Sequence, residues 1–151
     1  MLDRYDRNIL EILQADGRIS NQDLASKVGL SPSPCLRRVR ALEEGGVIKG
    51  YRACLDAQKL GLSLMALIHI SIDAHTPERF DNFEREIAAI PEIVECLLIT
   101  GKEADYQLKA IISDMDAYRA LLLDRITRIP GVNGVLSSFV LRQYDKPSLP
   151  L

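Results

Sequence analysis

The fold is constrained most strongly by residues 21–46, which read NQDLASKVGLSPSPCLRRVRALEEGG. Gly29 divides the stretch, because glycine readily takes the positive φ that ends a helix. Before it, Asn21 is a suitable N-cap, and apolar residues follow at helical spacing at Leu24, Ala25 and Val28. This pattern predicts a short helix that stops at Gly29, with a small alanine side chain where a second helix must approach.

A second helix is predicted immediately after this stop. Ser31 can cap it, and Pro32 fits its first turn, where a missing backbone N–H costs no hydrogen bond. Arg37 projects almost opposite an apolar side, which gathers Cys35, Leu36, Val39 and Leu42. Two helices joined by a tight turn in this way predict a helix-turn-helix motif.

The second helix carries groups that suit DNA recognition. A helix fits the major groove, its N-terminal residues meet base edges, and arginine can grip guanine or phosphate with two donors. The predicted DNA-binding residues are Gln22, Ser31, Pro32, Ser33, Arg37, Arg38 and Arg40. Ser33, Arg37 and Arg40 are expected to contact bases or phosphates, whereas the others position the helix or, for Gln22, reach the DNA backbone. The alternative is that these arginines only form a solvated helix face.

Overall composition does not by itself suggest a nucleic-acid partner. The 151 residues carry 19 basic and 21 acidic side chains, a net charge of −2. Residues 1–52, however, contain nine basic and seven acidic residues, whereas the remainder contains ten and fourteen. The modest positive charge therefore lies where phosphate contacts would form. Because a weakly basic head binds DNA poorly alone, we expect a symmetric oligomer that reads paired half-sites roughly 34 Å apart.

Several other classes of protein are disfavoured. The longest apolar run, residues 60–72, is interrupted by glycine and polar residues, so we expect neither a membrane span nor a membrane partner. The N-terminus lacks a secretion signal, which makes a cytoplasmic location the expectation. Three widely spaced cysteines suit neither a disulfide framework nor a zinc site. His69 lies in an apolar strand without a nucleophile or nucleotide-binding motif, so we predict no enzyme, metal or cofactor.

The N-terminal region completes the predicted head. Asp3 can cap a helix that carries an apolar stripe and packs across the other two. Residues 47–55 suggest one or two short strands interrupted at Gly50. A linker follows, and we place the domain boundary near residue 60: residues 1–60 form the helix-turn-helix DNA-binding domain with its connecting strand, and residues 61–151 form the second domain.

The second half predicts the order strand, helix, strand, strand, helix, strand. Strands are expected at residues 64–73, 93–100, 106–113 and 132–143. One helix starts at Thr76 and the other is capped by Asp114. Two β-α-β units of this order give an antiparallel sheet with both helices on one face. The fold class is therefore α+β: a helix-turn-helix (winged-helix-like) head plus a ferredoxin-like βαββαβ domain. A second subunit is the simplest cover for the other face of the sheet.

The motif residues resemble those of a known family, the Lrp/AsnC bacterial transcription regulators (feast/famine regulatory proteins). The resemblance lies in Leu30, Ser31, Arg38, Val39, Leu42, Glu43, Gly46, Val47, Ile48, Gly50 and Tyr51. Two proline steps, IPEIV at 90–94 and IPGV at 129–132, extend it over nearly the full length. It implies a homodimer, with octamers of four dimers as a higher assembly, whose C-terminal domain joins subunits and binds an amino-acid effector between them.

The resemblance also points to the turn before the third strand, TGKEADY at residues 100–106. In the family a glycine and an Asp-aromatic pair lie beside the amino-acid pocket, where a carboxylate can bind the ammonium group. The predicted effector-binding residues are Thr100, Gly101, Glu103, Asp105 and Tyr106 at this turn, with Ser137 and Ser138 on the last strand as lining of a neighbouring pocket. The alternative for the two serines is a half-exposed position without a ligand. The family usually has two residues between glycine and aspartate, whereas this turn has three, which either moves Asp105 or brings Glu103 into its place. The alternative is an ordinary turn with exposed charges.

Together these expectations describe a sequence-specific DNA-binding transcription regulator that responds to an amino acid. Two alternatives stay open. One is a DNA-binding architectural protein without effector control. The other is an amino-acid sensor that does not bind DNA, which would leave residues 31–40 without a role.

Overall fold

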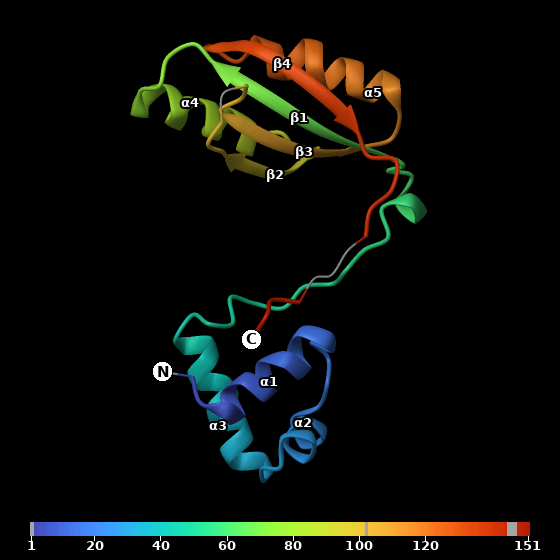
Figure 1. The fold of residues 1–151 in the computed structure, drawn as a ribbon. Coiled ribbons are helices and arrows are strands. Elements are labelled where there is room, and N and C mark those ends of the chain that lie inside the picture. The colour runs from blue at the N-terminus through green and yellow to red at the C-terminus, as the bar shows by residue number, and fades with distance from the viewer. Residues whose placement is uncertain (1, 102, 145–147) are drawn as a thin grey trace. The chain divides into compact units, whose positions relative to one another are not determined.

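The computed structural model describes residues 2–101, 103–144 and 148–151, and Figure 1 shows the course of the chain. It forms two compact units. The first is Met1–Cys54 together with Tyr144–Leu151, which we call the head, and the second is Leu55–Gln143, which we call the sheet unit. Within the described residues, no helix is long and apolar enough to cross a membrane.

Three helices build the head: α1 (Arg4–Ala15), α2 (Asn21–Val28) and α3 (Pro32–Glu44). Each contributes to one small core, whose buried members are Ile9, Leu10, Leu24, Ala25, Val28, Cys35 and Leu42. Burying a large aliphatic side chain contributes about 1.5–3 kcal/mol, so this cluster is the main source of stability of the head. The predicted three-helix arrangement is confirmed.

The turn between α2 and α3 follows the predicted geometry. Gly29 ends α2 with φ 75° and ψ 35°, the left-handed conformation that favours glycine. The next N–H, of Leu30, donates to the carbonyl of Ala25 at 2.9 Å. The Ala25 side chain is 1% exposed, which agrees with a small residue at the point where the two helices meet.

One predicted helix cap is wrong, and a second is correct in position but makes no capping hydrogen bond. Ser20, not Asn21, caps α2: its hydroxyl accepts the N–H of Asp23. Asn21 instead donates from Nδ2 to the carbonyl of Pro32 at 2.9 Å and so ties α2 to the start of α3. Ser31 occupies the N-cap position of α3, but its side chain makes no capping hydrogen bond. For α2, the neighbouring Ser20 takes the capping role, and the contact across the turn occupies the side chain of Asn21 instead.

The strands predicted over residues 47–55 are absent from the described chain. The N–H groups of Val47 and Ile48 both donate to the carbonyl of Leu42 at 3.0 Å and close the end of α3. Beyond them, residues 51–56 carry no regular secondary structure. The physical reason is that a strand needs a neighbouring strand to satisfy its backbone, and one chain offers none here.

The sheet unit has the predicted ferredoxin-like order. Its elements are β1 (Leu64–Ile72), α4 (Pro77–Ala88), β2 (Ile93–Leu98), β3 (Tyr106–Ile112), α5 (Met115–Ala120) and β4 (Val132–Phe139). The antiparallel strands lie in the order β2-β3-β1-β4. A short 3-10 turn, Gln58–Leu60, precedes β1, and α5 continues as a π-helical turn (Leu121–Arg125) and a 3-10 turn (Ile126–Arg128). β4 ends four residues earlier than predicted.

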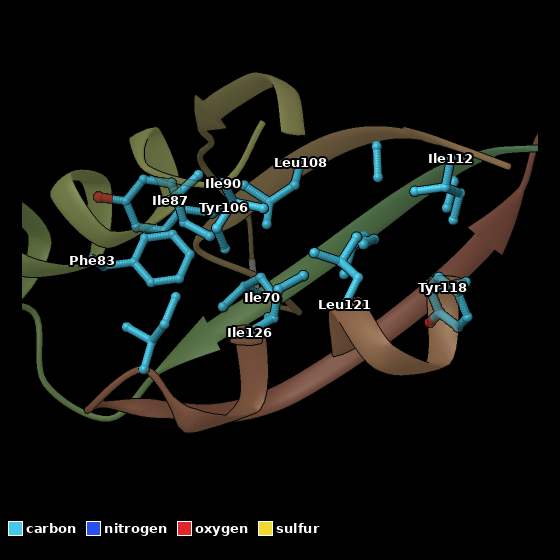
Figure 2. Packing of buried hydrophobic residues seen from close by; sticks show 14 of the residues in the cluster. Ile70, Phe83, Ile87, Ile90, Tyr106, Leu108, Ile112, Tyr118, Leu121 and Ile126 are labelled. Carbon is cyan, nitrogen blue, oxygen red and sulfur yellow. The ribbon is translucent and has the colours of Figure 1, made fainter. Parts of the chain in front are cut away.

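Both helices cover the same face of this sheet, which we call the inner face. Alternate residues of β1 and β3 are buried, as expected where one side of each strand faces a core. Figure 2 shows side chains of α4, such as Phe83 and Ile87, and of the α5 region, such as Leu121 and Ile126, meeting the strands between them. Tyr106 is fully buried there and packs on Phe83, with ring centroids 4.6 Å apart.

None of the described helices and strands of this unit covers the opposite, outer face of the sheet. The register aligns one row of side chains across all four strands: Leu97, Gln107, His69 and Leu136. The next row consists of Glu95, Lys109, Leu67 and Ser138. Leu97 is 43% exposed and Leu136 63% exposed. Large apolar side chains on an open sheet face indicate an interaction surface.

Candidate functional site

Helix α3 presents the predicted DNA-contacting side chains to solvent. Ser33, Arg37 and Arg40 are exposed, as are Ser31 and Pro32 at the first turn. The exposed hydroxyl of Ser31 makes no capping hydrogen bond, and its O–H is a donor that suits a phosphate oxygen. Arg37 and Arg40 form no ion pair with any residue that the structure describes, so their donors are not consumed within the protein.

Arg38 has a different environment from its two arginine neighbours. Its Nη1 lies 2.8 Å from a carboxylate oxygen of Asp3 and 2.7 Å from one of Asp6, and its guanidinium lies 5.4 Å from the centre of the Tyr5 ring. The hydrogen bond to Asp6 is the main reason that the pKa of Arg38 is raised further. Arg38 therefore joins α3 to the first turn of α1, and its Nη1 is engaged within the protein.

The same contacts affect Asp3. Its carboxylate accepts the N–H of Asp6 at 2.9 Å while its own N–H donates to the Asp6 carboxylate at 3.1 Å. The pKa of Asp3 is lowered, first by that backbone N–H and further by the Arg38 guanidinium.

On α2, Gln22 is exposed in the first turn of the helix, where a contact to the DNA backbone is sterically possible.

A hollow of about 400 Å³ opens beside the turn that precedes β3. It is lined by His69, Ile99, Gly101, Glu103, Ala104 and Leu136. Two of the predicted effector residues, Gly101 and Glu103, thus lie together at one hollow. Chain neighbours aside, no described atom lies within 4 Å of the position that a Cβ on Gly101 would take, so a ligand can approach the backbone there. Glu103 is exposed and enters no ion pair among the described residues.

Asp105 is already engaged within the protein. One of its carboxylate oxygens accepts the N–H of Ile72 at 2.7 Å, and the other lies 2.7 Å from Nε2 of His75. Its side chain is 20% exposed, and the His75 ring stacks on Phe80. The aspartate therefore fastens the end of β1 to the turn. A ligand's ammonium group would have to share these oxygens with the existing partners.

The remaining predicted effector residues lie elsewhere. Tyr106 is buried on the inner face, and its hydroxyl donates to Glu84 at 2.7 Å; burial is the first cause of its raised pKa. Ser137 also faces inward, where it hydrogen-bonds the hydroxyl of Tyr118. Ser138 lies on the outer face opposite Leu67. Thr100 is exposed next to the hollow but does not line it.

Sequence reasoning missed Ile99 and Ala104 beside the turn, and it also missed the two residues of the hollow that lie on neighbouring strands, His69 and Leu136. They are paired across β1 and β4, so only the strand register brings them together. His69 Nε2 lies 3.2 Å from the side-chain oxygen of Gln107, and its Nδ1 is buried without a hydrogen-bond partner in the described chain. Buried polar atoms in proteins normally have a hydrogen-bond partner, so this unpaired ring nitrogen is unusual. Alternation along β1 would have placed His69 outward, but not beside the turn.

Comparison with known families assigns the two halves separately. Residues 2–49 match the winged helix-turn-helix DNA-binding family, and residues 65–149 match the Lrp/AsnC ligand binding domain. The chain belongs to the Lrp/AsnC family of transcription regulators.

Relatives and solved structures cover nearly the whole chain. The leucine-responsive regulatory proteins of Escherichia coli (strain K12) and Salmonella typhimurium (strain LT2) are 46% identical over 145 residues, which cover 96% of this chain and 88% of theirs. A Neisseria meningitidis transcriptional regulator in complex with L-Met superposes with a TM-score of 0.94 at 38% identity, covering 99% of this chain and 97% of that one. An AsnC family regulator from Agrobacterium tumefaciens gives 0.92 at 37% identity, with coverages of 99% and 97%.

These matches show the general function of the protein. This Lrp/AsnC protein is a DNA-binding transcription regulator with a ligand-binding domain. The family to which it belongs is one of regulators, not of enzymes. Among the residues that the structure describes, no group of three or more His, Cys, Asp or Glu side chains is placed to hold a metal ion.

Proposed function

We propose that this Lrp/AsnC regulator binds paired DNA half-sites as a homodimer or higher oligomer, and that an amino acid bound at the hollow beside Gly101 changes how its subunits pack. Residues 1–60 would serve DNA binding, and residues 61–151 would serve assembly and effector binding. The observation that best supports this proposal is that His69 and Leu136 belong both to the hollow and to the uncovered outer face. A ligand there would touch the surface that a second subunit covers.

The outer face supports the proposed dimer. Leu67, Leu97 and Leu136 would lose their contact with water when two such faces meet. Burial of apolar area is the dominant favourable contribution to most protein association. The charged pair Glu95 and Lys109 lies in the same rows and would restrict the register of the two faces. Four dimers closing into an octamer remain the higher assembly that we propose.

The hollow favours an amino acid with an apolar side chain. Ile99, Ala104 and Leu136 supply apolar walls, and Glu103 supplies a carboxylate for the ammonium group. Glu103 is better suited than Asp105, whose two oxygens already bind Ile72 and His75. The backbone at Gly101 can approach the ligand's carboxylate. This assignment supports the second of the two expectations for the lengthened turn, namely that Glu103 takes the place of Asp105.

A ligand acts only through a difference in affinity between two assemblies. The decisive experiment measures light scattering and operator binding at fixed salt, with and without a panel of amino acids. We expect at least one apolar amino acid to shift both the oligomeric state and the operator affinity. If none changes either quantity while the operator is still bound, the effector role is wrong and an architectural DNA-binding role replaces it.

Matched variants test the assignment of the site. Glu103→Gln should weaken binding of the effective amino acid by about tenfold or more, because it removes the charge facing the ammonium group. Asp81→Gln, on the exposed side of α4, is the control and should bind as the original chain does. Asp105→Asn should instead lower thermal stability, because it weakens the contact with His75. Weakened effector binding in Asp105→Asn alone would move the ammonium site to Asp105.

A further inference from the structure

The last residues of the chain contact the head. The N–H of Leu149 donates to Oε1 of Gln14 at 2.6 Å, and Nε2 of Gln14 donates to the carbonyl of Leu149 at 3.3 Å. One side-chain amide thus satisfies both backbone groups of one residue, in the way that a neighbouring strand would. Such a reciprocal pair fixes the direction of the bound segment as well as its position.

An apolar hollow adjoins this pair of hydrogen bonds. It has a volume of about 250 Å³ and is lined by Leu10, Leu13, Gln14, Val47, Ile48, Lys49, Gly50, Tyr51, Leu149 and Leu151. Leu151 is 40% exposed and Leu149 72% exposed, so the terminal leucine packs more deeply. None of the predicted DNA-contacting residues lines this hollow, so a segment bound there leaves the exposed side chains of α3 accessible.

We propose that residues 148–151 are a strap: the chain's own C-terminus docks in the hollow between α1 and residues 47–51. The chain runs from the head through residue 55 into the sheet unit, and the strap brings it back to the head after β4. The head is then joined to the sheet unit by two segments instead of one. A second tether reduces the orientations open to the head and so narrows the spacing of half-sites that an oligomer can bind.

Hydrogen exchange on the full-length protein tests the docking. The C-terminal peptide and the peptide covering residues 8–16 should exchange about tenfold faster in Gln14→Ala, which removes both hydrogen bonds. Gln14→Glu keeps the acceptor for the 2.6 Å bond and should show an intermediate rate. Gln58→Ala, an exposed glutamine of the sheet unit, is the control and should change neither peptide. Equal exchange in the original chain and Gln14→Ala would overturn the strap.

A mixture of two variants decides which chain supplies the strap. One variant ends at residue 147 and keeps the hollow, while the other is full length and carries Gln14→Ala. If the strap docks within its own chain, neither variant can form the contact and the mixed oligomers stay unprotected. Protection that returns on mixing would show docking between subunits and would contradict the same-chain assignment.

The consequence for DNA rests on the proposed paired half-sites, whereas the exchange experiments do not. The chain ending at residue 147 should lose several-fold of its discrimination between an operator of correct spacing and one lengthened by half a helical turn. Its affinity for a single half-site should stay the same, since the strap does not cover the exposed residues of α3. Unchanged discrimination together with lost protection would show a strap that docks without restricting the head.

Discussion

The head and the sheet unit differ in how much of their apolar surface they bury. The head encloses a small core among three helices and turns Arg37 and Arg40 outward on α3. The sheet unit buries a larger core against α4 and α5 but leaves the outer face, with Leu97 and Leu136, open. One exposed surface is therefore suited to a charged polymer and the other to a second protein surface. The division of labour that we propose, DNA binding by the head and assembly by the sheet unit, rests on this difference.

The sharpest test of the contrast is to place a charge on the outer face. Leu67→Asp puts a carboxylate at the centre of that face, between Lys109 and Ser138 in the register. We expect light scattering to report monomers, and operator affinity to fall roughly 100-fold or more because paired binding is lost. Leu141→Asp, at a side chain that is 98% exposed, is the matched control and should leave assembly intact. A thermal melt distinguishes lost assembly from unfolding, and a Leu67→Asp dimer that binds normally would refute the outer face as the interface.

Within the sheet unit, Gly131 is the position where one added methyl group should cost most. It has φ +98°, a conformation that side chains with a Cβ rarely adopt, and a Cβ there would overlap the side chain of Arg79, the residue that pairs with Asp73. Gly131→Ala should lower the free energy of unfolding by about 2–4 kcal/mol, measured by denaturant titration. Gly101→Ala, which has open space around its Cβ, should stay within about 0.5 kcal/mol of the original. Equal stability of the two variants would mean that the loop after α5 adapts to the methyl group.

On the head, neighbouring arginines should separate DNA affinity from stability. Arg37→Ala should weaken operator binding by about 1–3 kcal/mol if Arg37 contacts a base, with an unchanged thermal melt. The measurement is a titration at fixed salt against the operator and a scrambled duplex. A variant that binds both duplexes as the original does would remove Arg37 from the DNA-binding surface.

Arg38→Ala, in contrast to Arg37→Ala, should change the thermal melt. The variant loses the contacts to Asp3 and Asp6, so the head should melt at a lower temperature, whereas Arg38→Lys should recover part of the loss.

The stability of the head should also depend on pH in the acid range. Because the folded pKa of Asp3 lies below its ordinary value of about 3.9, its contribution is full above that value and is lost as pH falls through the folded pKa. In Asp3→Asn, thermal stability should therefore fall less steeply as the pH is lowered. An unchanged fall would show that Asp3 does not contribute to the pH dependence.

Much of the fold could be predicted because its signals are local. Gly29 and Ala25 fix a tight turn from their own conformational freedom and size, and the turn forms as expected. Alternation along β1 and β3 identifies strands with one buried side. Asp114 caps α5 as predicted, since its carboxylate accepts the N–H of Ala117. In each case the cause lies within a few residues of the effect.

The effector site was less predictable because it is assembled from distant strands. The turn motif pointed to Gly101 and Glu103, which do lie together at the hollow. It could not show that Ile72 and His75 occupy the carboxylate of Asp105. Alternation alone predicts that Ser137 and Ser138 point to opposite faces of the sheet, but only the packing of β4 showed that Ser137 is the one that faces inward.

The sequence by itself determined the helix-turn-helix, the order of strands and helices, and the arginines that α3 carries. These depend on periodicity, caps and turn residues, whose energies act between near neighbours in the chain. Only the tertiary structure decided that Arg38 is held by Asp3 and Asp6, that Asp105 is bound within the protein, and that Leu149 returns to Gln14. Those outcomes depend on which distant groups compete for the same hydrogen bonds, and that competition is settled only when the chain is packed.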